Sequence, residues 1–539
     1  MAEILPTNSP LFNHLVLEKV LNYLEFSDLK TFRLVCIFWH QVSSPYFVSQ
    51  AKIYLEGTSL EQLVSNESSS ANSLRLIPFE YYTIKINSLL STNDGVKILW
   101  STIHNNIKYL TLHVTTVYAK KELKWLLLYN LPLLKKVKIF VMKYWGTLEE
   151  NLDNSAILQE PGEDVQTNSS LQSFQLSYLG SMSWYGYEEG GNEFSFPIPW
   201  IRFFRRFSSL SHLALIGVAA QDVAEMIESF GEVAAGSNTP LKNLEILDEN
   251  SFPEIPNDEH LGSLANLSQH NHFESLHLEI SPLTTITILS NLLENNADTL
   301  KTLRLRRYPH PYLAMMPITL AIELQHVAFL EISDSLTPSL SFLPHMPALK
   351  TLHIILRDYR NLPACEIIHN TPNPQRVSHG GVTNLYIEPP LISRSCIEKL
   401  AICFPALETL QIRLSNEMMH ELCTQAVTWK KLNSLHITSW DGLTDEGITG
   451  ISCEILKFWG GYSSFEARKH RKNPSIGNIK SLTSLTIEMW ADYENHISDW
   501  SVYYGILDLT NLQHVTLIRT EISNTAFKAI PVKKKVLVD

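Results

Sequence analysis

The sequence predicts an α/β solenoid, in which a curved parallel sheet lines the inside and helices cover the outside. Two observations carry this prediction. A six-residue pattern, apolar-x-x-Leu-x-apolar, recurs along the chain, and stretches with helical periodicity lie between its copies. Repetition at a period of roughly 20 to 50 residues is the mark of a repeat array rather than of a compact globule. Because such arrays present extended binding surfaces, the pattern also favours recognition over catalysis.

Each copy of the pattern is predicted to form one strand. Positions 4 and 6 are almost always Leu, Ile or Val and lie two residues apart, so both point to the buried side of an extended chain. Positions 3, 5 and 7 are then expected to face solvent. At a mean spacing of about 31 residues, the copies begin at Tyr81, Ile107, Leu134, Leu171, Leu210, Leu241, Phe273, Leu300, Val327, Leu349, Val382, Leu407, Leu432, Leu482 and Leu512.

The stretches between the strands predict amphipathic helices. Ile286, Leu289, Leu292 and Leu293 fall on one side of a helix, and residues 220–228 show a similar apolar stripe. A bulky helix behind each narrow strand bends the array. Three spacings are longer than the rest and contain insertions near residues 149–170, 184–200 and 459–480, which are expected to be exposed loops.

Composition changes along the chain divide it into five segments. The predicted organisation is a flexible tail at residues 1–10, a helical domain at 11–50, a linker or first capping segment at 51–80, the repeat array at 81–530 and a basic tail at 531–539.

Residues 11–50 predict three short helices. Leu17, Val20, Leu21 and Leu24 form the apolar face of the first. Ser27 is the expected N-cap of the second, with Asp28 in its first turn. Pro45 is expected to help end the third. Forty residues make a marginal isolated core, so part of this apolar surface is expected to pack on the array or on another protein.

This helical block resembles an F-box. The resemblance lies in Val20-Leu-Asn-Tyr-Leu24, then Asp28-Leu29, then Leu34-Val-Cys36-x-x-Trp39, in the order and spacing of that motif. The usual opening Leu-Pro and Glu are replaced by Phe12-Asn13 and Leu15, and Ile37 stands where a basic residue is usual. The array is similar to the leucine-rich repeats that often follow an F-box, with residues 397–412 and 443–448 similar to the cysteine-containing subtype.

The two resemblances imply a substrate-receptor subunit of an SCF-type ubiquitin ligase. The F-box would dock on a Skp-type adaptor and through it on a cullin scaffold, and the repeats would present an unknown protein substrate. The receptor itself would perform no chemistry, since it acts by proximity. The implied adaptor-binding residues are Leu15, Leu17, Val20, Leu21, Leu24, Leu29, Leu34, Val35 and Trp39.

Motif searches favour a binding protein over an enzyme. The chain contains no P-loop, dinucleotide fingerprint, HExxH or GxSxG, so no catalytic residue, metal site or cofactor is predicted. A formal net charge of −12 disfavours nucleic-acid binding. No apolar run is long enough to predict a membrane span. The six cysteines form no CxxC pair and are expected to be reduced and mostly buried, as in an intracellular protein.

The pattern geometry also predicts a recognition surface. Arg304 and Arg306 project from the same strand, and Arg pairs well with carboxylate or phosphate, so an acidic or phosphorylated substrate segment is a candidate ligand. The alternative is a solvated charged face with no ligand. The candidate substrate-binding residues are His277, Arg304, Arg306, His353, Tyr386 and Arg413.

Two rival readings stay open. In one, the chain is a repeat scaffold whose N-terminal helices only cap the array. The other, an enzyme with a cryptic site, has no motif to support it. The expected location is the cytoplasm, with nuclear import as a further option because Arg468–Lys472 and Lys533–Lys535 are basic.

Overall fold

The computed structural model describes the strand-forming parts of the chain and most of its C-terminal half. The described residues are 13–56, 79–86, 106–115, 131–142, 170–179, 204–205, 207, 209–218, 220–234, 241–247, 259–280, 286–307, 318, 320–355, 365–391, 393–439, 443–459, 464–489 and 497–538. The predicted insertions near 149–170 and 184–200 fall almost entirely outside these residues.

The chain forms two compact units, which are described separately. Unit 1 comprises Met1–Glu254 and Glu259–Asn271, and unit 2 comprises Ile255–Asp258 and His272–Asp539. In unit 1 the elements are α1 (His14–Leu21), α2 (Phe26–Phe32), α3 (Ile37–Gln50), β1 (Lys52–Glu56), β2 (Tyr81–Ile86), β3 (Tyr109–Thr115), β4 (Lys136–Met142), β5 (Ser173–Leu179), β6 (His212–Ile216), α8 (Ala220–Ala234), β7 (Asn243–Leu247) and α9 (Glu259–Ser268).

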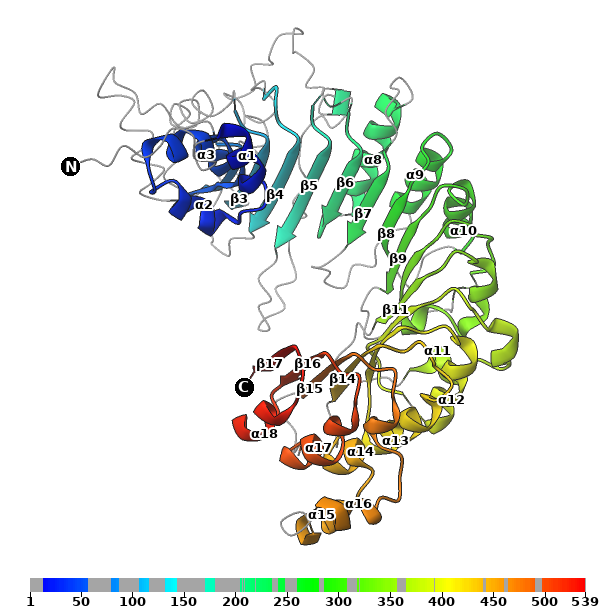
Figure 1. Ribbon diagram of the computed structural model, residues 1–539. Helices are drawn as coiled ribbons and strands as arrows, with labels where there is room; N and C mark the ends of the chain where they lie inside the picture. Colours follow the sequence, from blue (N-terminus) through cyan, green and yellow to red (C-terminus); the bar gives the residue numbers. More distant parts are fainter. Residues whose placement is uncertain are drawn as a thin grey trace, which may run out of the picture. The chain divides into compact units, whose positions relative to one another are not determined.

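Unit 2 continues the alternation of strands and helices. Figure 1 shows α11, α12, α13, α14 and α17 along one side of its strands. Its strands are β8 (Ser275–Ile280), β9 (Thr302–Arg307), β10 (Phe329–Ser333), β11 (Thr351–Ile355), β12 (Asn384–Ile387), β13 (Thr409–Arg413), β14 (Ser434–Ser439), β15 (Ser484–Met489), β16 (His514–Ile518) and β17 (Lys534–Val538). Its α-helices are α10 (Ile286–Asn295), α11 (Glu366–His369), α12 (Arg394–Cys403), α13 (Asn416–Gln425), α14 (Asp445–Thr449), α15 (Cys453–Trp459), α16 (Ser464–Lys469), α17 (Asp499–Tyr504) and α18 (Asn524–Ala529). Short 3₁₀ turns occupy Asp334–Leu336, Leu340–His345, Pro374–Val377, Ile476–Asn478 and Ile506–Asp508.

Strand pairing confirms the predicted α/β repeat fold. The strand pairs among the described residues are parallel, and consecutive strands pair in chain order within each unit. Position 4 pairs with position 4 and position 6 with position 6, as in Leu303↔Leu330 and Leu305↔Ile332. These four side chains are no more than 1% exposed. The repeated leucines are therefore the core, as the alternation predicts.

The first predicted copy is two residues out of register. Ile84 pairs with Leu112, which occupies position 6 of its own repeat, so the first copy begins at Phe79 rather than at Tyr81. Two further strands lie outside the predicted array. Strand β1 lies in the predicted linker and pairs with β2, and β17 lies wholly within the predicted basic tail and pairs with β16.

The N-terminal helices differ from prediction at two positions. Helix α2 begins at Phe26 with Glu25 as its N-cap, so Ser27 lies inside the helix, while Asp28 does lie in the first turn. Helix α3 continues through Pro45 to Gln50. A proline inside a helix removes one backbone hydrogen bond. Near it, the hydroxyls of Ser43 and Ser44 donate to the carbonyls of Trp39 and His40 at 2.6 Å.

In unit 2, side chains of one repeat cap the helix of the next. The side-chain oxygen of Asn416 accepts from the backbone N–H of Thr444, the N-cap residue of α14. Asp445 in the first turn of α14 in turn accepts four hydrogen bonds, from the backbone N–H and hydroxyl of Ser498 and of Ser501. Asp499 in α17 then accepts from the backbone N–H and hydroxyl of Ser523. These contacts lock successive repeats, because each satisfies N–H groups that a helix start leaves unpaired.

The face opposite the core, formed by positions 3, 5 and 7 and called here the open face, is less exposed than predicted. His277 is 6% exposed, Glu331 4% and Arg413 8%. Neighbouring strands in a sheet lie about 4.8 Å apart, so long side chains in register cover one another. Side chains at positions 3, 5 and 7, which the strand pattern predicts to face solvent, are thus partly buried by side chains at the same positions of adjacent repeats.

Three further properties of the described residues bear on function. None of the described helices is long and apolar enough to cross a membrane. All six cysteines are free thiols, and Cys365, Cys396, Cys403 and Cys423 are buried as predicted. Within the same residues, no three His, Cys, Asp or Glu side chains gather in a way that would hold a metal ion.

Candidate interaction sites

Helices α1 to α3 form a small core of their own. Leu17, Leu21, Leu29 and Val42 are at most 6% exposed, and aromatic side chains including Phe32 and Trp39 pack against them. Three of the predicted adaptor-binding residues, Leu17, Leu21 and Leu29, therefore hold the helices together and are not exposed to a partner. Each contributes about 1.5–3 kcal/mol by its burial.

Trp39, another predicted adaptor-binding residue, is only partly buried. Its ring stacks on Phe32 with centroids 4.0 Å apart. Its backbone N–H donates to Cys36 Sγ, the side chain that caps α3. Leu24 is likewise partly buried against the core. These two residues connect the interior of the block with its surface.

The remaining predicted residues form an exposed apolar set. Leu15 is 69% exposed, Val20 43%, Leu34 85% and Val35 58%. Sequence reasoning missed three more members of this set: Val16, Tyr23 and Ile37. Val16, Val20 and Tyr23 follow a helical i, i+4, i+7 spacing, which is the signal that would have found them. Ile37, at 79% exposed, stands where the F-box pattern usually has a basic residue.

This much exposed apolar surface on so small a block needs an explanation. Single exposed leucines are ordinary, whereas a group of large apolar side chains marks an interaction site. The group lies on α1, at Tyr23 just beyond its end, and on the segment from the end of α2 to Ile37, the first residue of α3. The N-terminal block therefore carries a candidate protein interface.

Comparison with known proteins gives a family match over the same helices. Residues 5–49 match the family model described as the F-box domain. Residues 5–49 thus form an F-box domain, which is followed by a parallel-strand array of the leucine-rich-repeat type. Curated proteins give no match to the chain. A matching solved structure, "Crystal structure of Rad7 and Elc1 complex in yeast", is 11% identical over 97% of this chain and 91% of that chain, with a TM-score of 0.30.

The predicted substrate-binding residues of β9 to β12 form a cluster on the open face of unit 2. At its centre is Glu331, whose side chain is 5% exposed. Arg306 Nε donates to Glu331 Oε1 at 2.7 Å, and Arg304 Nε lies 3.9 Å from Oε2. His353 Nδ1 lies 3.6 Å from the same Oε2. The two arginines that the sequence analysis assigned to an acidic substrate thus share a carboxylate within the chain.

The charge balance of this cluster is visible in the pKa of Glu331. Burial alone would raise that pKa. Interactions with His353, Arg306 and Arg304 lower it by more than burial raises it. The pKa falls from 4.5 to about 2. The carboxylate is therefore ionised at neutral pH and cancels one of the two arginine charges.

Aromatic rings extend the cluster across neighbouring strands. The Arg304 guanidinium lies over the Phe329 ring, 5.0 Å from its centroid. His353 meets Tyr386 edge-on with centroids 4.4 Å apart. His277 lies beside Arg304 in the register, whereas Arg413 lies two strands away from His353. Four of the six predicted residues, Arg304, Arg306, His353 and Tyr386, are thus brought together, His277 lies next to them on β8, and Arg413 is separate and buried.

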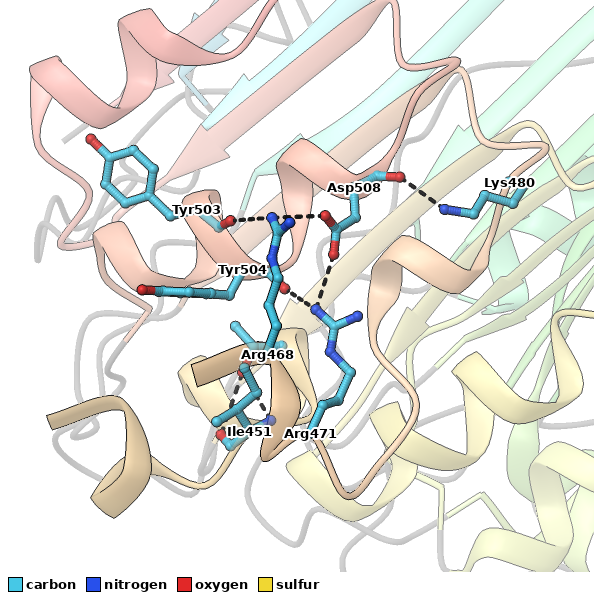
Figure 2. A network of polar contacts seen from close by, with 8 residues as sticks. Ile451, Arg468, Arg471, Lys480, Tyr503, Tyr504 and Asp508 are labelled. Carbon is cyan, nitrogen blue, oxygen red and sulfur yellow. Dashed lines mark hydrogen bonds and ion pairs between the residues drawn. The ribbon is translucent and has the colours of Figure 1, made fainter. Parts of the chain in front are cut away.

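The basic stretch near residue 470 has a structural role. Figure 2 shows Arg468 and Arg471 converging on Asp508. Arg468 Nη2 lies 3.0 Å from Oδ1 of Asp508, and Arg471 Nη2 lies 3.0 Å from Oδ2. Arg468 also donates to the backbone carbonyl of Tyr503, and Arg471 to that of Tyr504. Lys480 Nζ donates to the Asp508 carbonyl at 3.1 Å. The insertion is therefore attached to the next repeat rather than being a free basic loop.

Proposed function

We propose that this chain is the substrate receptor of an SCF-type ubiquitin ligase, with its F-box docked on a Skp-type adaptor. The observation that carries the proposal is the combination of an F-box match with an exposed apolar set on the matched helices. Leu15 and Leu34 are the strongest candidates for adaptor contact, because they are the most exposed of the predicted residues. Large apolar side chains that fill a partner's pocket dominate binding energy in interfaces.

The proposal assigns no catalysis to this chain. The adaptor would link it to a cullin scaffold, and the open faces of the repeats would hold a protein substrate. Its contribution would be to raise the local concentration of substrate lysines near the ubiquitin-carrying enzyme. The cytoplasm is the proposed location, with nuclear import as an option. Arg468 and Arg471, however, are already bound to Asp508, and Lys534 lies in β17.

Co-purification with a Skp-type adaptor tests the docking. Wild-type chain is expected to retain the adaptor, and Leu15→Asp with Leu34→Asp is expected to lose it without a change in melting temperature, because both side chains are exposed. Val427→Asp is the matched control, since Val427 is also 69% exposed but lies on unit 2. Equal adaptor recovery from wild type and the double variant would refute docking through this set.

Removing residues 1–50 separates the proposal from the scaffold alternative. A receptor loses adaptor binding on deletion. A scaffold binds no adaptor at all and shows only a sharp drop in melting temperature, because its capping helices are gone.

A further inference from the structure

The open face of unit 1 differs from that of unit 2 in its chemistry. Strands β2, β3 and β4 pair in register, so their positions 3, 5 and 7 form three rows across the sheet. We call eight of these nine residues, all except Lys85, the β2–β4 face: Tyr81, Thr83, Tyr109, Thr111, His113, Lys136, Lys138 and Phe140. All eight side chains are partly exposed.

Two of the rows contain a pair of stacked aromatic rings, and the row between them contains two threonines. Tyr81 and Tyr109 stack with ring centroids 4.2 Å apart and planes within 6°. His113 and Phe140 stack with centroids 5.0 Å apart at 18°. Thr83 and Thr111 pair between these rows. Stacked rings hold each other in place, so the face offers flat apolar surface whose conformational freedom is already restricted.

Lys136 and Lys138 give this face its charge. Both project from β4, and their register neighbours Tyr109, Ser173, Thr111 and Gln175 are uncharged. Among the residues that the structure describes, neither lysine has a carboxylate partner. Other basic residues do, since Lys108 is paired with Glu80 and Arg306 with Glu331. The two lysines thus differ from the arginines of unit 2, whose charge is partly cancelled.

The charges of the two lysines also affect His212 on β6, two strands away from β4. The pKa of His212 is lowered, first by burial and then by the charges of Lys136 and Lys138, against an opposing effect of Glu245.

We propose that the β2–β4 face binds an extended acidic segment of the protein substrate, with acidic residues at alternate positions followed by an aromatic residue. Lys136, Lys138 and Phe140 are spaced two residues apart on one strand, which is about 6.6 Å per step. An extended peptide has the same repeat, so one running along β4 places acid, acid and aromatic side chains opposite these three residues in turn. The aromatic side chain would meet the stacked His113 and Phe140 rings.

A peptide fits this face better than a nucleic acid does. Binding to nucleic acid relies on neutralising many phosphates, and this face offers two unpartnered lysines on a chain of net charge −12. Two carboxylates need only two lysines. The biological meaning of the site rests on the proposed receptor function, but binding itself needs neither the adaptor nor the ligase.

Fluorescence anisotropy with the full chain tests the site. The probe is a labelled peptide containing Ser-Glu-Ser-Glu-Ser-Phe-Ser, and the comparison peptides replace both Glu by Gln or place them adjacent. The first is expected to bind at low salt and to weaken at high salt. The Gln peptide is expected to lose about tenfold or more in affinity, and the adjacent-Glu peptide a smaller amount.

Variants locate the binding. Lys136→Glu with Lys138→Glu is expected to weaken binding of the Glu peptide at least tenfold, whereas Lys430→Glu with Lys431→Glu, the same charge change at exposed positions of unit 2, leaves it unchanged. Circular dichroism checks that both variants remain folded. Lys136→Gln with Lys138→Gln, which adds no repulsion, is expected to show an intermediate loss.

Three results would overturn the proposal: equal binding of the Glu and Gln peptides, equal effects of the two lysine pairs, or tighter binding of an oligo-dT of equal charge than of the peptide. Adaptor co-purification is measured on the same Lys136 and Lys138 variant. If the adaptor is retained while the peptide is lost, both ideas stand. If wild type binds the peptide but no adaptor, only the proposed receptor function fails.

Discussion

Arg306 Nε donates a 2.7 Å hydrogen bond to Oε1 of Glu331, a carboxylate that is only 5% exposed. Because Arg304 and His353 approach the other carboxylate oxygen, this one acid organises side chains from three strands. In the sequence, Arg304 and Arg306 suggest a site for an anion. In the structure, the two arginines belong to an ion-pair network within the chain.

Replacing Glu331 should destabilise unit 2. Glu331→Gln keeps the size of the side chain but leaves two arginines without their counter-ion, so we expect a loss of about 2–3 kcal/mol, between the values for exposed and buried pairs. Urea unfolding at neutral pH measures it. Glu274→Gln is the control, because its partner Lys301 is 63% exposed, and its cost should stay below about 1 kcal/mol. Equal losses would show that burial of Glu331 is unimportant.

The difference in stability between wild type and Glu331→Gln should depend on pH in a defined way. The pKa of Glu331 is lowered from 4.5 to about 2, so its ionised form stabilises the fold fully above pH 4.5, and the contribution is lost as pH falls toward 2. The difference in unfolding free energy between wild type and Glu331→Gln should be constant from pH 7 to 5 and shrink below pH 4.5. A difference that grows on acidification would contradict this assignment.

Asp445 should be the most sensitive of the inter-repeat caps. It is 6% exposed and accepts four hydrogen bonds from Ser498 and Ser501. Asp445→Ala leaves buried N–H groups unpaired, and we expect it to cost about 3 kcal/mol. Asp499→Ala removes two exposed hydrogen bonds to Ser523 and should cost about 1 kcal/mol. Thermal unfolding of the two variants should therefore rank them in that order.

Asp508 should control how firmly the insertion is held. Asp508→Ala removes the carboxylate that both Arg468 and Arg471 contact. Local opening should rise by about tenfold, equivalent to about 1.4 kcal/mol, and tryptic cleavage after these arginines should accelerate to match. Glu417→Ala, which removes a 74% exposed partner of Arg394, is expected to leave the cleavage rate unchanged. Cleavage at the wild-type rate in Asp508→Ala would mean that other contacts hold the insertion.

The strands could be placed from the sequence because the pattern is periodic. For the copies from Ile107 to Leu512, the strand begins two residues after the predicted start, as with Leu300 and Thr302. The Tyr81 copy was misplaced because a shift of two residues keeps the same side chains on the same face. Only pairing with β3 decides between the two frames. Strand β17 was missed because its side chains are largely exposed and leave no buried alternation to detect.

The candidate sites were predicted less completely. The motif identified the right helices, but alternation and helical period cannot tell which apolar residues of a short block turn inward. Leu21 is fully buried and Leu34 is 85% exposed, although both belong to the same motif. On the open face, the β2–β4 residues were not singled out, because stacking of Tyr81 on Tyr109 depends on two strands 28 residues apart lying in register.

By itself, the sequence determined the repeat, the parallel strands with their leucine core and the F-box at the N-terminus, because periodicity and motif spacing are local properties of the chain. The tertiary structure decided which charges remain available to a partner. Arg304 and Arg306 lie against Glu331, while Lys136 and Lys138 lie among uncharged neighbours. The physical reason is that an ion pair depends on the few ångströms between adjacent strands, and those distances join residues that are far apart in sequence.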